Sequence, residues 1–187
     1  SSGILPVQDF LSAIKDTLGV ERFWFFPTLA WFNASNNFLQ LLGVAGVIFS
    51  LLLIIGVATI PVLIALFILY LSFVTVGQDF MMFQWDVLLL EVGFLAIFFS
   101  PRQIFPNAST HPSHTVVWLF RWLLFRLMLA SGVLKLASGD PIWRNLTALS
   151  YHFETQPLPG PLSWYVHHLP EELLKFLTLG MFGVELV

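Results

Sequence analysis

The chain has 187 residues, of which 57% are hydrophobic and only 10% are charged, and its net charge is −3. Soluble domains have about 25% charged residues, so most of this chain is predicted to lie in lipid. The small acidic charge and the lack of a basic stripe argue against a nucleic-acid partner. The lack of cysteine excludes disulfides and cysteine-based metal sites.

The first segment, residues 1–37, alternates between apolar and polar residues. From Pro6 to Leu18 the apolar side chains recur at helical spacing, with Gln8, Asp9, Lys15 and Asp16 on the other side. Trp24 and Trp31 follow, and tryptophan is enriched at membrane interfaces. The segment is therefore predicted to form an interfacial helix followed by an aromatic anchor.

Long apolar runs follow and predict the membrane spans. The run after residue 37 is too long for one span of about 20 residues, and Gly56 to Pro61 is the natural break. We expect complete spans at 38–58, 61–76, 78–100 and 116–136, a connection at 101–115, and the start of a fifth span at 171–187. The predicted fold class is an all-α polytopic transmembrane helix bundle, with 1–187 as a single transmembrane domain.

Ionisable residues lie within the third and fourth predicted spans. Lys135 is close to a span end, where its amine can reach the interface. Glu91 and Arg126 are central, and in an antiparallel helix pair they fall at nearly equal depth. We expect a buried Glu91–Arg126 ion pair that fixes helix register, with a proton-transfer or substrate site as the alternative.

The loop 137–170 is aromatic, polar and rich in proline. Pro157, Pro159 and Pro161 each fix the backbone, so the loop is expected to be a stiff, extended surface that lies over the mouth of the bundle. We predict that it binds a partner through eight residues: Trp143, Arg144, Tyr151, His152, Phe153, Glu154, Gln156 and Trp164.

Several polar residues of this loop are of types that can carry out chemistry. In an extended strand His152, Glu154 and Gln156 share a face, which suits acid–base or metal chemistry, but hydrogen bonding of the loop onto the bundle is the favoured interpretation. Glu154 is expected to pair with Arg144 or His152. We predict no catalytic set, no metal site and no cofactor; His167 and His168 are the candidate ligands if a pigment binds.

Four sequence blocks together resemble the lipase maturation factor family. They are SSGILP at 1–6, FQWDVLLLEVGFLAIFFSPR at 83–102, WLFRWLLFRLMLASGVLKLASGDPIW at 118–143 and YHFETQPLPGPLSWYVHHLP at 151–170. The resemblance implies a polytopic membrane protein of the animal endoplasmic reticulum, with bacterial relatives, that helps dimeric lipases reach their active state. It also implies a span before the first block and further chain after residue 187. The family is distantly similar to the membrane domain of vitamin K-dependent carboxylase.

Three functions follow as alternatives. The first is a factor that assists folding, maturation or assembly of a client or neighbouring membrane protein. The second is a non-catalytic subunit of a larger membrane complex, such as one that contains pigment. The third is a membrane enzyme distantly related to the carboxylase, using Glu91, Arg126 or His152.

Localisation and topology also have alternatives. The lack of cysteine favours a bacterial cytoplasmic or related internal membrane, whereas the glycosylation sequons at Asn33, Asn107 and Asn145 favour the endoplasmic reticulum. The resemblance implies that 1–37 and 137–170 are extracytoplasmic. The positive-inside rule implies the reverse orientation, because Lys15, Arg22 and Arg144 all lie on that side.

Overall fold

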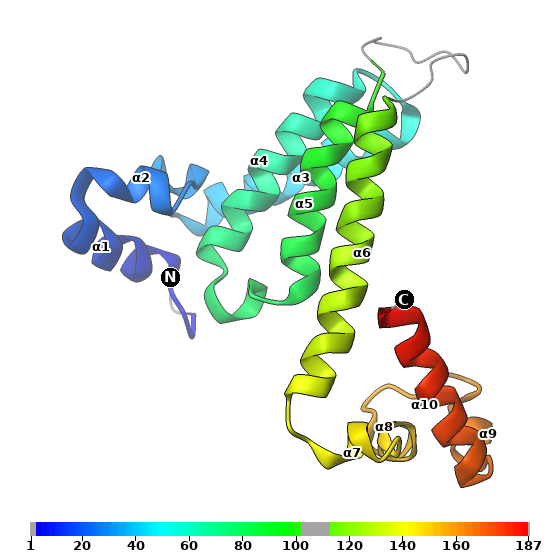
Figure 1. Ribbon diagram of the computed structural model, residues 1–187. Helices are drawn as coiled ribbons and strands as arrows, with labels where there is room; N and C mark the ends of the chain where they lie inside the picture. The colour runs from blue at the N-terminus through cyan, green and yellow to red at the C-terminus, as the bar shows by residue number, and fades with distance from the viewer. Residues whose placement is uncertain (1–2, 102–112, 187) are drawn as a thin grey trace. The chain divides into compact units, whose positions relative to one another are not determined.

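A computed structural model describes residues 3–101 and 113–186, and all regular elements in these ranges are helices (Figure 1). The predicted all-α class is therefore confirmed. The chain divides into two compact units, Ser1–Phe120 and Arg121–Val187. The predicted connection at 101–115, with the sequon at Asn107, falls largely on residues 102–112, outside the described ranges.

The first unit holds the N-terminal helices and a hairpin of long apolar helices. Its elements are α1 (Val7–Leu18), η1 (Gly19–Glu21), α2 (Arg22–Phe25), η2 (Leu29–Trp31), α3 (Asn36–Ile55), α4 (Thr59–Val76), η3 (Gln78–Met81) and α5 (Gln84–Phe99). The second unit holds most of α6 (His114–Ala137), then α7 (Pro141–Arg144), α8 (Ala148–Thr155), α9 (Ser163–His167) and α10 (Glu171–Leu186). Within the described residues, α3, α4 and α6 are long and apolar enough to cross a membrane.

The turn between α3 and α4 lies within the predicted break. Gly56 ends α3 with a φ of 80°, a left-handed conformation that glycine adopts without strain. Pro61 lies in the first turn of α4, where the missing N–H removes no helical hydrogen bond. Backbone chemistry thus divides one continuous apolar run into two helices.

The helix α5 begins later than the predicted span 78–100. Residues Gln78–Met81 form the short helix η3 instead, and α5 has 16 residues from Gln84. Asp86 sets this start, because its Oδ2 accepts a hydrogen bond from the Phe83 backbone N–H at 3.1 Å. Asp86 therefore belongs to the first turn of α5, where it is only 4% exposed.

The N-terminal segment packs against the C-terminal end of α4. Leu11 of α1, Ala30 and Val76 form the buried cluster between them. The Leu29 backbone N–H donates to Ser72 Oγ at 3.0 Å, and the Thr28 hydroxyl donates to the Ser72 carbonyl at 3.2 Å. The helix α1 coincides with the helix predicted from Pro6 to Leu18. The contacts attach the segment to one end of a candidate spanning helix.

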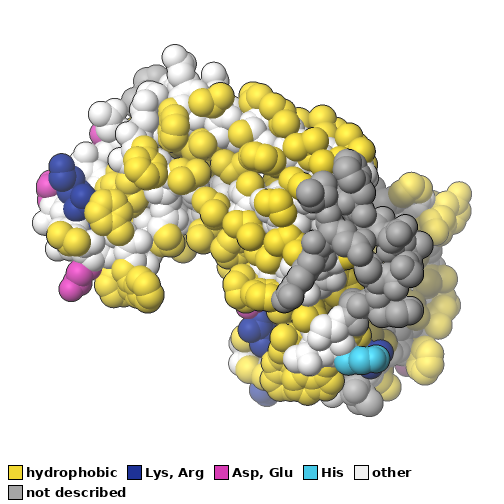
Figure 2. All heavy atoms as spheres, turned by 90° about the horizontal axis from the view of Figure 1, so that it is seen from above, with side chains coloured by type: hydrophobic (Ala, Val, Ile, Leu, Met, Phe, Trp, Pro, Cys, Tyr) yellow, Lys and Arg dark blue, Asp and Glu magenta, His cyan; other side chains and the backbone are white. Residues whose placement is uncertain are grey.

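The surface of the long helices is apolar. Only 6% of the α3 span is buried, and hydrophobic side chains cover much of the face seen in Figure 2. In water such a surface would drive aggregation, whereas in a bilayer it faces hydrocarbon. Together with the three candidate spans, it defines an integral membrane protein.

Candidate functional site

The loop between α6 and α10 folds into short helices rather than an extended crossing. Gly139 turns the chain after α6 with a φ of 76°. Asp140 then caps α7, because its Oδ1 accepts from the Ile142 N–H at 3.0 Å, and Pro141 occupies the first helical position. Pro157, Pro159 and Pro161 lie in the stretch 156–162, which is not helical. The expectation of an extended loop is therefore wrong upstream of them.

This correction changes how the predicted polar residues are related. Because α8 is a helix, His152, Glu154 and Gln156 do not share the face that a strand would give them. Glu154 lies exposed on α8, where water solvates a carboxylate, so the expected need for a partner at Arg144 or His152 does not arise. Arg144 and His152 are also exposed.

A polar pocket of about 360 Å³ lies between α8, α9 and α10. Tyr151 and His167 line it from α8 and α9, and Glu171 lines it from the first turn of α10. The His167 Nδ1 atom is buried and has no hydrogen-bond partner among the described residues. The other lining residues are Thr147, Ser150, Leu169 and Leu174. The pocket offers hydroxyl, imidazole and carboxylate groups, which suit a polar or peptide-like ligand.

Exposed rings and aliphatic side chains lie on α9 and in the stretch before it. The rings of Trp164 and Tyr165 meet edge to face at 5.2 Å, and Trp164 also lies 4.2 Å from His168. Trp164 and Tyr165 are each 65% exposed, and Leu158 and Leu162 are 89% and 69% exposed. Exposed apolar side chains of this size are typical of a binding surface.

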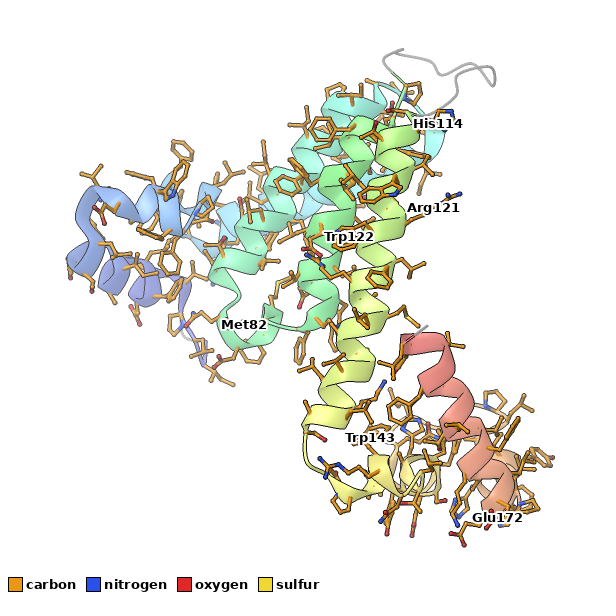
Figure 3. The ribbon with its side chains drawn as sticks, in the orientation of Figure 1. Met82, His114, Arg121, Trp122, Trp143 and Glu172 are labelled. Atoms are coloured by element: carbon orange, nitrogen blue, oxygen red, sulfur yellow. The ribbon has the colours of Figure 1, made fainter. Side chains whose placement is uncertain are left out.

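Two predicted binding residues, Trp143 and Phe153, are partly buried. Trp143 packs edge to face on Phe182 of α10, with ring centroids 6.2 Å apart, and lies below the end of α6 in Figure 3. The Lys135 amine lies 5.6 Å from the Trp143 ring centroid, a cation–π distance. Phe153 contacts the His152 ring at 5.2 Å. Trp143 thus links α7 to α10, and partner binding by both rings stays a prediction.

The sequence did not reveal an ion pair between Lys135 of α6 and Glu185 of α10. Lys135 was expected to reach the interface alone, yet it forms a salt bridge with Glu185, and its amine also donates to Ser131 Oγ at 2.9 Å. Their side chains are 22% and 10% exposed. The partners lie fifty residues apart, so only the tertiary fold brings them together.

Close packing of α6 against α10 accompanies this ion pair. A Cβ atom added at Gly132 would lie 2.7 Å from Leu186 Cδ2 and 3.2 Å from Glu185 Cβ. Glycine therefore permits the two helix ends to approach. Because α10 rises about 1.5 Å per residue, Glu171 lies about 21 Å along its axis from Glu185, in the layer of α8 and α9. Whether α10 starts a fifth span stays a prediction.

The structure also places the remaining residues that the sequence suggested as sites. Glu91 lies on α5 and Arg126 on α6, in different units, and their ion pair stays a prediction. His168 Nδ1 lies 2.7 Å from the Trp164 carbonyl oxygen, whereas His167 faces the polar pocket. Among the described residues, no group of three or more His, Asp or Glu side chains is placed to hold a metal ion.

Comparison with known proteins now identifies the family. The fold defines a polytopic α-helical membrane protein, and the family model for the lipase maturation factor transmembrane domain matches residues 1–187. The chain belongs to the lipase maturation factor family, which confirms the resemblance seen in the four sequence blocks. No solved structure matches the chain.

Curated relatives support the same assignment. The chain is 40% identical over 195 residues to human "Lipase maturation factor 1", with 99% of this chain and 34% of the relative covered. It is 45% identical over 202 residues to "Lipase maturation factor 2" of Xenopus laevis, with coverages of 98% and 27%. The chicken "Lipase maturation factor 2" is 42% identical over 195 residues. The chain thus spans between about a quarter and a third of the length of these relatives.

Proposed function

We propose that this chain forms the membrane domain of a maturation factor that assists the folding or assembly of a partner protein, and that its role is not catalytic. Family membership supports the proposal, because relatives covering the whole chain are named as lipase maturation factors. The relatives described above are vertebrate proteins, which favours the endoplasmic reticulum membrane over a bacterial one. A secreted lipase is the client class that their name indicates.

The partner surface is proposed to lie on the lumenal side, around the polar pocket of the second unit. The observation that supports this surface is the exposure of Tyr151, which lines the pocket, and of Trp164 and Tyr165 on α9, the helix that also supplies His167 to the pocket. The lumenal side is the one that the family resemblance implies for this loop. A folding client exposes apolar segments and unpaired backbone groups. Exposed rings next to hydroxyl, imidazole and carboxylate groups match both features.

The test is rescue of a lipase in cells that lack the endogenous factor. Full-length protein carrying Tyr151→Ala and Trp164→Ala should secrete several-fold less active lipase per mass of lipase than the wild type, and should recover less lipase by co-purification. The control is Trp24→Ala, which also replaces a large exposed ring with alanine, at a residue that is 85% exposed in the first unit. Equal lipase activity with both variants, at equal protein levels, would refute this surface.

A second candidate is a structural subunit of a larger membrane complex. The low burial of α3, at 6% of its span, leaves a long apolar face for lipid or for neighbouring proteins. The size of the native particle in mild detergent discriminates between the two functions. A particle of monomer size would exclude the subunit role.

A further inference from the structure

An apolar pocket in the first unit lies between three helices. It has a volume of about 270 Å³ and is lined by side chains of α3, α4 and α5, among them Leu53, Leu66 and Phe67. Ser50 and Tyr70 supply its two hydroxyls. Ser50 donates to the Gly46 carbonyl at 2.8 Å, and Tyr70 donates to Asp86 Oδ1 at 2.7 Å. Both hydroxyl protons are used within the protein, so the pocket presents mainly hydrocarbon.

The pocket runs along the spanning direction. Tyr70 is in the last two turns of α4 and Asp86 is in the first turn of α5. Leu63, which also lines the pocket, lies seven residues earlier on α4, about 10 Å along the helix axis from Tyr70. The pocket therefore extends along α4 inside the candidate span, with the Tyr70–Asp86 pair at one end and apolar side chains along its length.

Water does not fit such a pocket. A buried water needs two to four polar partners, and an apolar cavity of about 150 Å³ is known to stay dry and to bind small hydrocarbons. This pocket is larger, and an empty volume would forfeit dispersion contacts along its walls. Because α3 and α4 are themselves spans with little buried surface, the medium around the pocket is lipid.

We propose that this pocket binds one acyl chain of a bilayer phospholipid. The Tyr70 hydroxyl donates its proton to Asp86, which holds the Tyr70 ring in place as part of the pocket wall. The chain would fill the space between α3 and α5 and couple the hairpin to its lipid environment.

Gly93 on α5 leaves room for the chain. A Cβ atom added there would meet only Phe67 Cδ2 within 4 Å, at 4.0 Å. A leucine at this position would thus place its side chain in the pocket rather than clash with a helix. Gly43 on α3 is a matched control, because nothing lies within 4 Å of a Cβ added there and it does not line the pocket.

The test is photolabelling of the full-length protein in phosphatidylcholine vesicles. One acyl chain of the phosphatidylcholine carries a diazirine. We expect label on Leu53 and Phe67 to exceed label on Ile54, although Ile54 is 81% exposed. Gly93→Leu should lower the label on Leu53 and Phe67 at least fivefold, and Gly43→Leu should leave it unchanged.

One further variant and a second lipid probe complete the test. Gly93→Val, a smaller replacement, should give an intermediate loss of label if Gly93→Leu does not fold. Label that follows exposure alone, or that Gly93 variants do not reduce, would overturn the proposal. Label obtained from a free diazirine fatty acid but not from the phospholipid would overturn the assignment to bilayer lipid. The lipase rescue assay is separate, so failure of the partner surface would leave this test unaffected.

Discussion

At the scale of single residues, charge burial decides which side chains hold the second unit together. Lys135 and Glu185 form a largely buried ion pair, whereas Lys175 bonds Glu171 and Glu172 at an exposed helix start. A buried charge that loses its partner stays desolvated without compensation, while water replaces the partner of an exposed charge. The two lysines therefore have different importance for stability.

Glu185→Gln tests this difference. The change leaves the Lys135 ammonium without its counter-charge, so we expect a loss near the lower end of about 3–5 kcal/mol. Thermal unfolding in mild detergent should show a clearly lower Tm. Lys175→Met should remain close to the wild type, and adding Lys135→Met to the Glu185 variant should recover part of the loss. Identical Tm values for Glu185→Gln, Lys175→Met and the wild type would contradict the role of the pair.

Residue-scale chemistry also explains what the sequence could predict. Gly56 and Pro61 act through their own backbones, so the break between α3 and α4 was readable. Asp86 and Lys135 act through distant partners, Tyr70 and Glu185, which no local pattern reveals. The start of α5 and the ion pair of the second unit were accordingly missed.

At the scale of elements, one small side chain, Ser72, joins the N-terminal segment to α4 in addition to the apolar cluster around Val76. Ser72 is 3% exposed; its hydroxyl accepts from the Leu29 N–H and donates to the Ile68 carbonyl. Apolar patterning predicted the helix Val7–Leu18 and both long helices, because a lipid-facing backbone must satisfy its own hydrogen bonds. It predicted neither this attachment nor α8. The prolines after residue 156 led to the expectation of an extended loop instead.

Ser72→Ala should loosen the segment without unfolding α4. The Leu29 N–H would lose its acceptor, at a cost of about 1–3 kcal/mol. Hydrogen–deuterium exchange should quicken at Leu29 and Ala30. Ser50→Ala is the control, because the Ser50 hydroxyl only bonds back to Gly46 within α3. Unchanged exchange at Leu29 in the Ser72 variant would show that the Ser72 hydroxyl does not hold the segment.

At the scale of the whole molecule, the open question is whether α5 crosses the membrane. Its 16 residues span about 24 Å, less than the ~30 Å hydrocarbon thickness of a typical bilayer and close to the ~27 Å of the endoplasmic reticulum. If α5 crosses, the turn between α3 and α4 faces the opposite side from the loop 138–170. If it does not, both face the same side.

Single cysteines at two positions distinguish these topologies, because the chain has no cysteine of its own. Val57→Cys lies in the turn between α3 and α4, and Thr155→Cys lies at the end of α8. In sealed microsomes, a membrane-impermeant maleimide added outside should label Val57→Cys and spare Thr155→Cys. Detergent should expose both. Labelling of both positions without detergent would rule out four crossings.

The attachment of the N-terminal segment has a consequence for the position of the molecule in the bilayer. Phe23, Trp24, Phe25 and Phe32 are 51% to 85% exposed, and aromatic rings favour the headgroup level. Because Ser72 and the cluster around Val76 join this segment to α4, the exposed rings and α4 move together along the bilayer normal. The segment therefore fixes the depth of α4 in the bilayer. In a thicker bilayer the hairpin is left to adapt at its far end, around Gly56, by thinning the lipid there.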